Sequence, residues 1–182
     1  MFKRIDNNID FAKNENKISD YWNEINAFEK SLDIRKDSKI FRFYDGPPFP
    51  TGSPHYGNLL AGVIKDIVPR YWTMRGFFVE RRFGWDVHGL PIEMEVQKEL
   101  GLEDPQDIDD YGIDKFNEAC RSQVQTNTEN WEKITRKIGR WVDFENDYKT
   151  MDVGFMESVW WVFKELYDKG LIYKDYKVLP YS

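Results

Sequence analysis

Apolar residues recur at helical spacing in several stretches of this chain. They lie three or four positions apart within residues 18 to 31, and again from Leu59 to Trp72, where the pattern is long and strongly amphipathic. Three further helices are predicted: residues 91 to 100, which Pro91 opens, residues 115 to 138, which are unevenly amphipathic, and residues 152 to 169. The chain is therefore expected to be rich in helices that each bury one face.

Local signals set the expected bounds of the helix around Leu59 to Trp72. Ser53 and Pro54 suit the N-cap and the first helical position. Pro69 removes a helical hydrogen bond and predicts a kink or a break, and Gly76 is expected to end the element.

Two short apolar runs flank this helix and predict strands, at residues 40 to 44 and 77 to 83. A strand, a helix and a strand within one short segment form a βαβ unit, so the strands should be parallel. The loops that follow both strands then lie at the edge of the sheet where α/β proteins bind ligands. Residues 101 to 114 are expected to be a solvated connector, residues 141 to 150 irregular, and residues 171 to 181 one or more strands.

Composition narrows the class of protein. The 182 residues suffice for one domain with a core, or one domain with attachments. No apolar run is long enough for a membrane span and the N-terminus lacks a signal sequence, so a cytoplasmic protein is expected. The single Cys120 excludes an internal disulfide and a multi-cysteine zinc site. A net charge of −6 argues against a free-standing nucleic-acid binder, but not against a catalytic piece of a larger RNA-binding protein.

The segment from Asp45 to Asn58 combines prolines and glycines with the expected start of a helix. Such a loop is rigid and lets backbone approach a ligand closely. His55 would add a donor beside the free N–H groups of the first helical turn, which favours anions. A phosphate-binding corner is the preferred interpretation, and a rigid turn with a structural histidine is the alternative.

Asp86 lies in a glycine-flanked turn after the second predicted strand. A carboxylate there suits an ammonium group, although a turn aspartate that binds its own backbone fits equally well. His88 suggests an Asp–His pair, but no G-x-S-x-G nucleophile elbow accompanies it. Arg81 and Arg82 favour ion pairs over phosphate binding, and the pair Trp160 and Trp161 favours core packing over a stacking platform.

Several common site motifs are missing from the chain. There is no H-E-x-x-H and no paired C-x-x-C, so a protein-bound metal is not expected. There is also no Walker A loop and no G-x-G-x-x-G, which makes P-loop and dinucleotide sites poor interpretations.

Three separated motifs resemble the isoleucyl branch of the class I aminoacyl-tRNA synthetases. His55-Tyr56-Gly57-Asn58 is similar to the HIGH signature, and Pro47 to Gly52 before it looks like the branched-chain subgroup. Gly84 to Glu93 and Trp141 to Thr150 are similar to isoleucyl motifs, most of all to the cytosolic eukaryotic type and its bacterial relatives. The resemblance covers roughly residues 18 to 182.

The resemblance implies an α/β fold, namely the first half of a Rossmann-like nucleotide-binding domain. Residues 1 to 39 would form an N-terminal helical extension. Residues 40 to 182 would form the N-terminal half of the catalytic domain and end where the editing insertion normally begins. The implied function is ATP-dependent activation of isoleucine and its transfer to tRNA(Ile), with Mg²⁺ brought by ATP. No protein-bound zinc is expected in this segment, and no membrane partner.

The resemblance also implies roles for individual residues, and no protein nucleophile is required. Catalysis would be positioning and charge stabilisation, carried by His55 and Asn58. The residues expected to bind ATP are Pro48, Thr51, Gly52, His55, Gly57 and Asn58. The residues expected to bind the amino acid are Gly46, Pro47, Asp86 and His88, with Asp86 holding the α-ammonium group.

Two departures from the family pattern bear on function. Asn58 stands where histidine is common, and an amide can still donate a hydrogen bond. No KMSKS-like sequence is present, so the chain is expected to be a fragment of a larger enzyme, a truncated product or a partial gene model. The fragment alone is expected to be inactive, and the rival interpretation is a non-catalytic module that binds a nucleotide or a protein.

Overall fold

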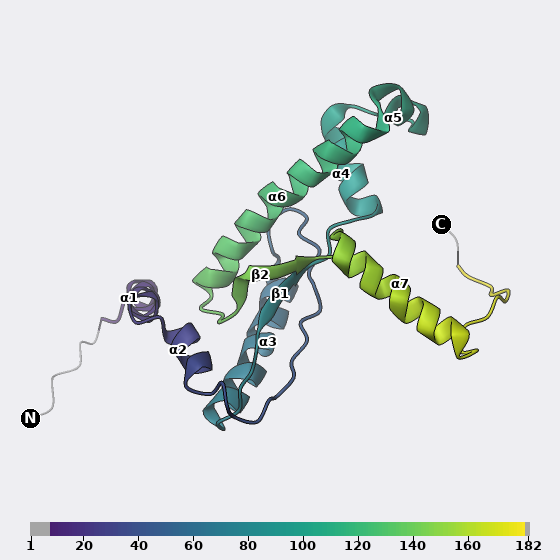
Figure 1. The fold of residues 1–182 in the computed structure, drawn as a ribbon. Coiled ribbons are helices and arrows are strands. Elements are labelled where there is room, and N and C mark those ends of the chain that lie inside the picture. Colours follow the sequence, from purple (N-terminus) through teal and green to yellow (C-terminus); the bar gives the residue numbers. More distant parts are fainter. Residues whose placement is uncertain (1–7, 181–182) are drawn as a thin grey trace, which may run out of the picture.

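The computed structural model describes residues 8 to 180. Helices and a short strand pair alternate along the chain (Figure 1). The elements in order are α1 (Phe11–Glu24), α2 (Ala27–Asp33), α3 (Tyr56–Met74), β1 (Arg82–Trp85), α4 (Leu90–Leu100), α5 (Pro105–Tyr111), α6 (Ile113–Lys137), β2 (Asp143–Lys149) and α7 (Val153–Asp168).

Strands β1 and β2 pair in parallel, and α4, α5 and α6 form the crossover between them. Arg82 lies opposite Asp143 and Gly84 opposite Tyr148, with an irregularity between these two pairs. The prediction that residues 141 to 150 are irregular is therefore wrong. The acidic side chains of this segment gave no strand pattern, because pairing with β1 forms its hydrogen bonds and Phe144 is the only buried residue of the strand.

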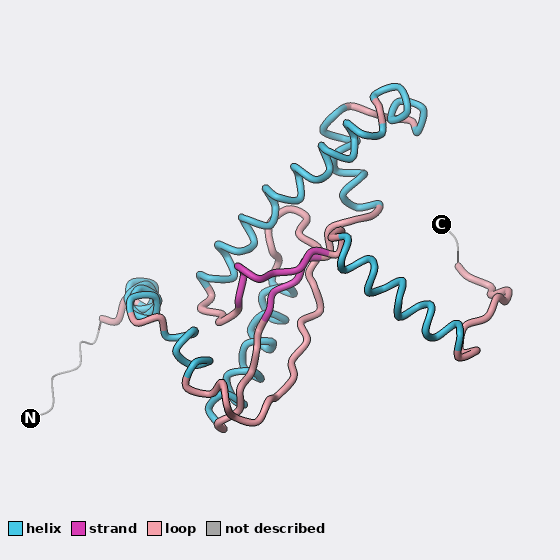
Figure 2. Tube along the Cα trace, in the orientation of Figure 1, coloured by secondary structure: helices cyan, strands magenta, loops and turns pink. Residues whose placement is uncertain are grey.

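The two strands predicted around α3 are much shorter than expected. Residues 40 to 44 and 77 to 83 meet in one parallel bridge, between Ile40 and Phe78, and β1 begins only at Arg82. The parallel direction is confirmed, but the predicted extent is wrong. Figure 2 shows the long loop that replaces the first strand. Ion pairs between the Asp45 side chain and other elements hold this loop, whereas a strand would be held by backbone hydrogen bonds to a neighbouring strand.

In the first half of the chain, the helix bounds in the structure differ from the predicted ones. Residues 18 to 31 form parts of two helices, because Asn26 adopts a left-handed φ of 49° between them. Helix α3 begins after His55, so the predicted cap at Ser53 and Pro54 is wrong. The helix also continues through Pro69, whose ring is buried, so the predicted break does not occur.

Two further segments differ in part from their predictions. Residues 101 to 114 are mostly exposed, as expected of a solvated connector. The expected connector at residues 101 to 114 contains α5, which Asp107 caps by accepting from the backbone N–H groups of Glu103 and Asp104. These hydrogen bonds hold the pKa of Asp107 below its ordinary value. No strand forms within residues 171 to 180, and residue 181 lies outside the described range.

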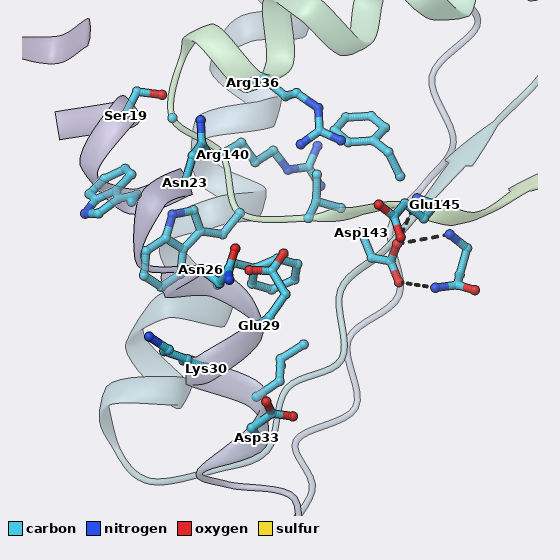
Figure 3. Close-up of a pocket in the computed structure, with 18 residues that line it drawn as sticks. Ser19, Asn23, Asn26, Glu29, Lys30, Asp33, Arg136, Arg140, Asp143 and Glu145 are labelled. Atoms are coloured by element: carbon cyan, nitrogen blue, oxygen red, sulfur yellow. Dashed lines mark hydrogen bonds between the residues drawn. The ribbon is translucent and has the colours of Figure 1, made fainter. Parts of the chain in front are cut away.

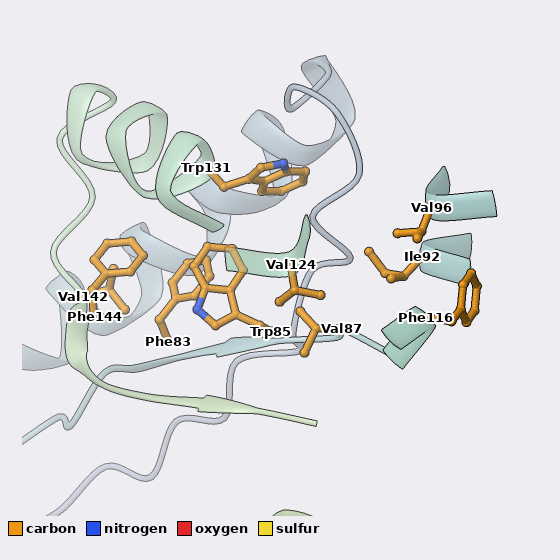
Figure 4. Close-up of a cluster of buried hydrophobic side chains, with 10 residues drawn as sticks. All are labelled: Phe83, Trp85, Val87, Ile92, Val96, Phe116, Val124, Trp131, Val142 and Phe144. Atoms are coloured by element: carbon orange, nitrogen blue, oxygen red, sulfur yellow. The ribbon is translucent and has the colours of Figure 1, made fainter. Parts of the chain in front are cut away.

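One hydrophobic cluster lies between the strand pair and helices α4 and α6 (Figure 4). Its buried members are Phe83, Trp85, Val87, Ile92, Val96, Phe116, Val124, Trp131, Val142 and Phe144. The N-terminal helices attach separately, through the Arg70 guanidinium, which lies 5.1 Å from the ring centroid of Trp22 and 4.2 Å from that of Trp141.

Helix α7 confirms the predicted element at residues 152 to 169 but not its predicted burial. No residue within α7 is buried, and in Figure 1 the helix projects away from the strand pair. Of its apolar side chains, Phe155 is half-buried, and Val159, Val162, Phe163 and Leu166 are exposed. Trp160 and Trp161 are 67% and 63% exposed, so the prediction of core packing is wrong for this pair.

Within residues 8 to 180, no helix has the length and apolarity needed to cross a membrane.

Candidate functional site

His55 and Asn58 cap the start of α3 through their side chains, each of which accepts a hydrogen bond from a backbone N–H. The backbone N–H of His55 donates to Asn58 Oδ1 over 3.1 Å, and the Gly57 N–H donates to His55 Nδ1 over 3.1 Å. Because Nδ1 accepts, a neutral His55 carries its proton on Nε2. The arrangement leaves the His55 Nε2–H and the Asn58 amide as potential donors at the positive end of the helix.

Gly57 is needed for this arrangement. A Cβ at Gly57 would lie 2.9 Å from His55 Cε1 and 3.1 Å from its Nδ1, so a side chain there would displace the imidazole. The missing side chain makes room for His55 itself. The role that the resemblance implies for Gly57, contact with ATP, stays a prediction.

The two predicted motif loops lie together at the end of the strand pair. The Asp86 N–H donates to the Pro48 carbonyl over 2.9 Å, which joins the proline-rich loop to the turn after β1. Trp131 of α6 donates from Nε1 to the Gly52 carbonyl over 2.9 Å. Loop carbonyls thus accept from elements distant in sequence, and these bonds fix a segment that has no regular structure of its own.

Thr150 organises the turn that contains Asp86 and His88. Its hydroxyl accepts from the Val87 N–H over 3.0 Å, lies 2.7 Å from His88 Nδ1 and 3.5 Å from Asp86 Oδ1. Asp86 and His88 therefore share Thr150 as a neighbour. Sequence reasoning missed Thr150, because only the β1–β2 pairing brings it beside the turn.

Asp45 is a second residue that sequence reasoning missed. Its side chain has no exposed surface, and Lys65 Nζ lies 2.6 Å from Oδ1 while Arg140 donates to Oδ2. The Tyr148 hydroxyl donates to the Asp45 carbonyl over 3.0 Å. Burial and the nearby Asp45 carboxylate raise the pKa of Tyr148. An aspartate directly before Gly-Pro-Pro, and a lysine among the apolar residues of α3, were the available signals.

Arg81 and Arg82 do not form the ion pairs that were expected. Arg81 is buried and donates to the Pro69 carbonyl and to Thr73, while Arg82 donates to backbone carbonyls that include Asn146. Among the described residues neither arginine pairs with a carboxylate. Burial lowers the pKa of Arg81 to about 10. Both residues connect segments of the fold through hydrogen bonds.

Two cavities adjoin this part of the fold. One, of about 640 Å³, lies beside His88 between α4, α6 and α7 and is mainly apolar. The other, of about 780 Å³, separates α1 and α2 from the segment that enters β2 (Figure 3). Its two arginines are already paired, Arg136 with Glu132 and Arg140 with Asp45. Asn146 and Glu145 donate to Asp143 and lower its pKa despite its partial burial.

The donor set offers no metal centre. Within the described part of the chain, no group of three or more histidine, cysteine, aspartate or glutamate side chains is placed to hold an ion. The start of α3 offers hydrogen-bond donors from His55 and Asn58, and the turn after β1 offers the side chain of Asp86. That combination suits a ligand with an anionic group and an ammonium group.

The family model "tRNA synthetases class I (I, L, M and V)" matches residues 17 to 182. The chain belongs to this family of class I tRNA synthetases. A chain in the crystal structure of the ternary complex of Agrobacterium radiobacter K84 agnB2 LeuRS-tRNA-LeuAMS supports the same fold. It has a TM-score of 0.59 and 22% identity, and the match covers 88% of this chain and 18% of that one.

Relatives with a higher sequence identity than this structure are isoleucine–tRNA ligases. Isoleucine–tRNA ligase of Treponema denticola is 55% identical over 181 residues, 100% of this chain and 16% of the relative. The cytoplasmic isoleucine–tRNA ligase of Saccharomyces cerevisiae is 55% identical over 172 residues, 94% of this chain and 16% of the relative. The chain thus spans about one sixth of the length of these relatives.

Proposed function

We propose that this chain is the N-terminal part of an isoleucine–tRNA ligase that works in the cytoplasm. The longer enzyme would activate isoleucine with ATP and transfer it to tRNA(Ile). The observation that carries the proposal is the identity of 55% to isoleucine–tRNA ligases, over a segment that contains both motif loops. Residues 1 to 39 would be a helical extension, and residues 40 to 182 the first half of a Rossmann-like catalytic domain.

In the proposed reaction the isoleucine carboxylate attacks the α-phosphate of ATP, and pyrophosphate leaves with both electrons of the broken P–O bond. His55 Nε2–H and the Asn58 amide would donate to phosphate oxygens as charge develops. Pro48, Thr51, Gly52 and Gly57 would bind the rest of the nucleotide as loop and helix-start backbone. A magnesium ion would arrive with ATP, since the described residues offer no site of their own for it.

The isoleucine would lie beside the turn after β1. Asp86 would accept from its ammonium group, while Gly46, Pro47 and His88 would border the same pocket. The bond from the Asp86 N–H to Pro48 supports this proposal, because it fixes the two loops relative to each other. Thr150, whose hydroxyl lies 3.5 Å from Asp86 Oδ1, would orient the carboxylate.

The test is isoleucine-dependent ATP–pyrophosphate exchange by the full-length protein, with Asp86→Asn and His55→Ala. Asp86→Asn should raise the isoleucine KM steeply, because the ammonium group loses its charged partner, and the turn should survive because asparagine also suits turns. His55→Ala should lower kcat about 100-fold with little change in KM.

For each variant, one outcome would show that the residue has only a structural role. An unchanged isoleucine KM in folded Asp86→Asn would leave Asp86 as a turn residue. A His55→Ala enzyme within about twofold of wild type would leave His55 as a helix cap only. Absence of exchange by the wild-type protein with isoleucine, together with nucleotide binding, would favour the non-catalytic module.

A further inference from the structure

The Asp45 carboxylate joins three parts of the fold. Lys65 reaches it from α3, Arg140 from the segment between α6 and β2, and both contact it while its side chain is fully buried. Lys65 Nζ also donates to the Gly46 carbonyl over 2.7 Å. One lysine therefore holds two consecutive residues of the proline-rich loop.

Lys65 belongs to the same helix that His55 and Asn58 begin. Its contact with Gly46 closes a ring of chain that runs from Gly46 through the loop to His55 and back along α3. A rigid helix and a fixed contact set the separation between the two ends of the loop. Gly46 and Pro47 border the proposed isoleucine pocket, and His55 and Asn58 face the proposed phosphate position.

We propose that Lys65 and Asp45 are positioning residues that fix the isoleucine side of the site relative to the phosphate side. This inference rests on the proposed function. The reacting carboxylate and the α-phosphate belong to different substrates, held by different ends of the loop. Their approach depends on the separation of those ends, and a misplacement of about 1 Å is enough to slow such a reaction about 100-fold.

The kinetic signature follows from this geometry. Neither residue needs to touch a substrate, so each substrate still binds its own end of the loop. Loss of the Lys65 contact should therefore lower kcat for adenylate formation and leave both KM values nearly unchanged. A residue that only stabilises the fold would lower thermal stability and the fraction of active sites, but not the rate per active site.

The decisive variant is Lys65→Met in the full-length protein, because Lys65 has a side chain 30% exposed and its loss leaves the Asp45–Arg140 pair in place. The expected result is a fall of at least about tenfold in kcat per titrated active site, with the KM values for ATP and isoleucine within about threefold. Lys65→Arg keeps a cationic donor and should recover most of the rate. Lys164→Met removes a lysine from a surface pair on α7 and serves as the matched control.

A second readout separates this inference from the proposed function. Hydrogen exchange at the amides of Gly46, Phe49, Thr51 and Gly52 should become faster in Lys65→Met and remain at the wild-type rate in Lys164→Met. This holds whether or not the wild-type protein activates isoleucine. Unchanged exchange in the loop, or a wild-type kcat in Lys65→Met, would overturn the positioning role, whereas an inactive wild type with faster loop exchange would overturn only the proposed function.

Discussion

The buried cluster beside the strand pair and the long helices α3 and α7 both contain large apolar side chains but differ in what covers them. Trp85 of β1 is 1% exposed, under α4 and α6. Ile64 of α3 and Trp161 of α7 are 54% and 63% exposed. Periodicity predicts that a helix has an apolar face. It does not predict which surface will cover that face.

The covered region is built from residues far apart in sequence. Phe83 stacks on Phe144 with ring centroids 4.6 Å apart, and Trp131 of α6 lies over the same cluster. By contrast, α7 is connected to the rest mainly through its first turn, where Phe155 stacks on Tyr148 at 5.6 Å. Stability is therefore expected to concentrate in the strand pair with α4 and α6.

The largest expected effect is that of Trp85→Ala in this chain. The substitution leaves a cavity in the buried cluster and removes the 2.6 Å hydrogen bond from Trp85 Nε1 to Asp147. We expect a loss of about 3–5 kcal/mol in the free energy of unfolding, measured by denaturant titration and circular dichroism. A loss below about 1 kcal/mol would show that the cluster is loosely packed in solution.

A smaller loss is expected at Gly84, where the backbone of β1 lies against the Tyr148 ring of β2. A Cβ at Gly84 would lie 2.1 Å from Tyr148 Cζ, so Gly84→Ala must displace the tyrosine that donates to Asp45. Such overpacking costs about 1–3 kcal/mol. The same substitution made in a Tyr148→Ala background should cost much less, and equal costs in both backgrounds would show that the ring is not the obstacle.

Sequence reasoning predicted the parts of this fold that local patterns determine. The helical character of α3, α6 and α7 follows from apolar spacing, and that of α4 from Pro91 at its start. The parallel bridge at Ile40 follows from the order of elements. Strand β2 was missed because its hydrogen bonds come from β1. The break after Ile25 was missed because a single left-handed asparagine separates α1 from α2.

The candidate site also contains some residues that local motifs identify and others that only tertiary contacts identify. His55, Asn58 and Asp86 were identified from motifs, and the structure connects the Asp86 turn to the loop that precedes His55. Thr150 and Asp45 were missed, since each acts through partners about 60 to 100 residues away in sequence, such as Val87 and Tyr148. Motifs identify the residues of one loop, and tertiary contacts decide which distant residues hold it.

Thr150 lies between the covered region and the start of α7. Its substitution tests how much its hydrogen bond contributes to stability there. Thr150→Val keeps the shape but leaves the buried Val87 N–H without its acceptor. We expect a loss on the order of 1 kcal/mol in the free energy of unfolding. Thr150→Ser keeps the hydroxyl and should stay within about 0.5 kcal/mol of wild type, so an equal loss in both variants would indicate packing and not the hydrogen bond.

The smallest expected effect is that of Trp161→Ala, which repeats the Trp85 substitution in the uncovered region. Trp161 is mostly exposed and no residue of α7 is buried, so little apolar area returns to water. The free energy of unfolding of this chain should stay within about 0.5 kcal/mol of wild type. Exposed apolar faces of this size promote association, so sedimentation velocity should show less self-association in the variant. A loss comparable to that of Trp85→Ala would mean that α7 packs against the rest of the chain in solution, and the contrast between the two regions would then disappear.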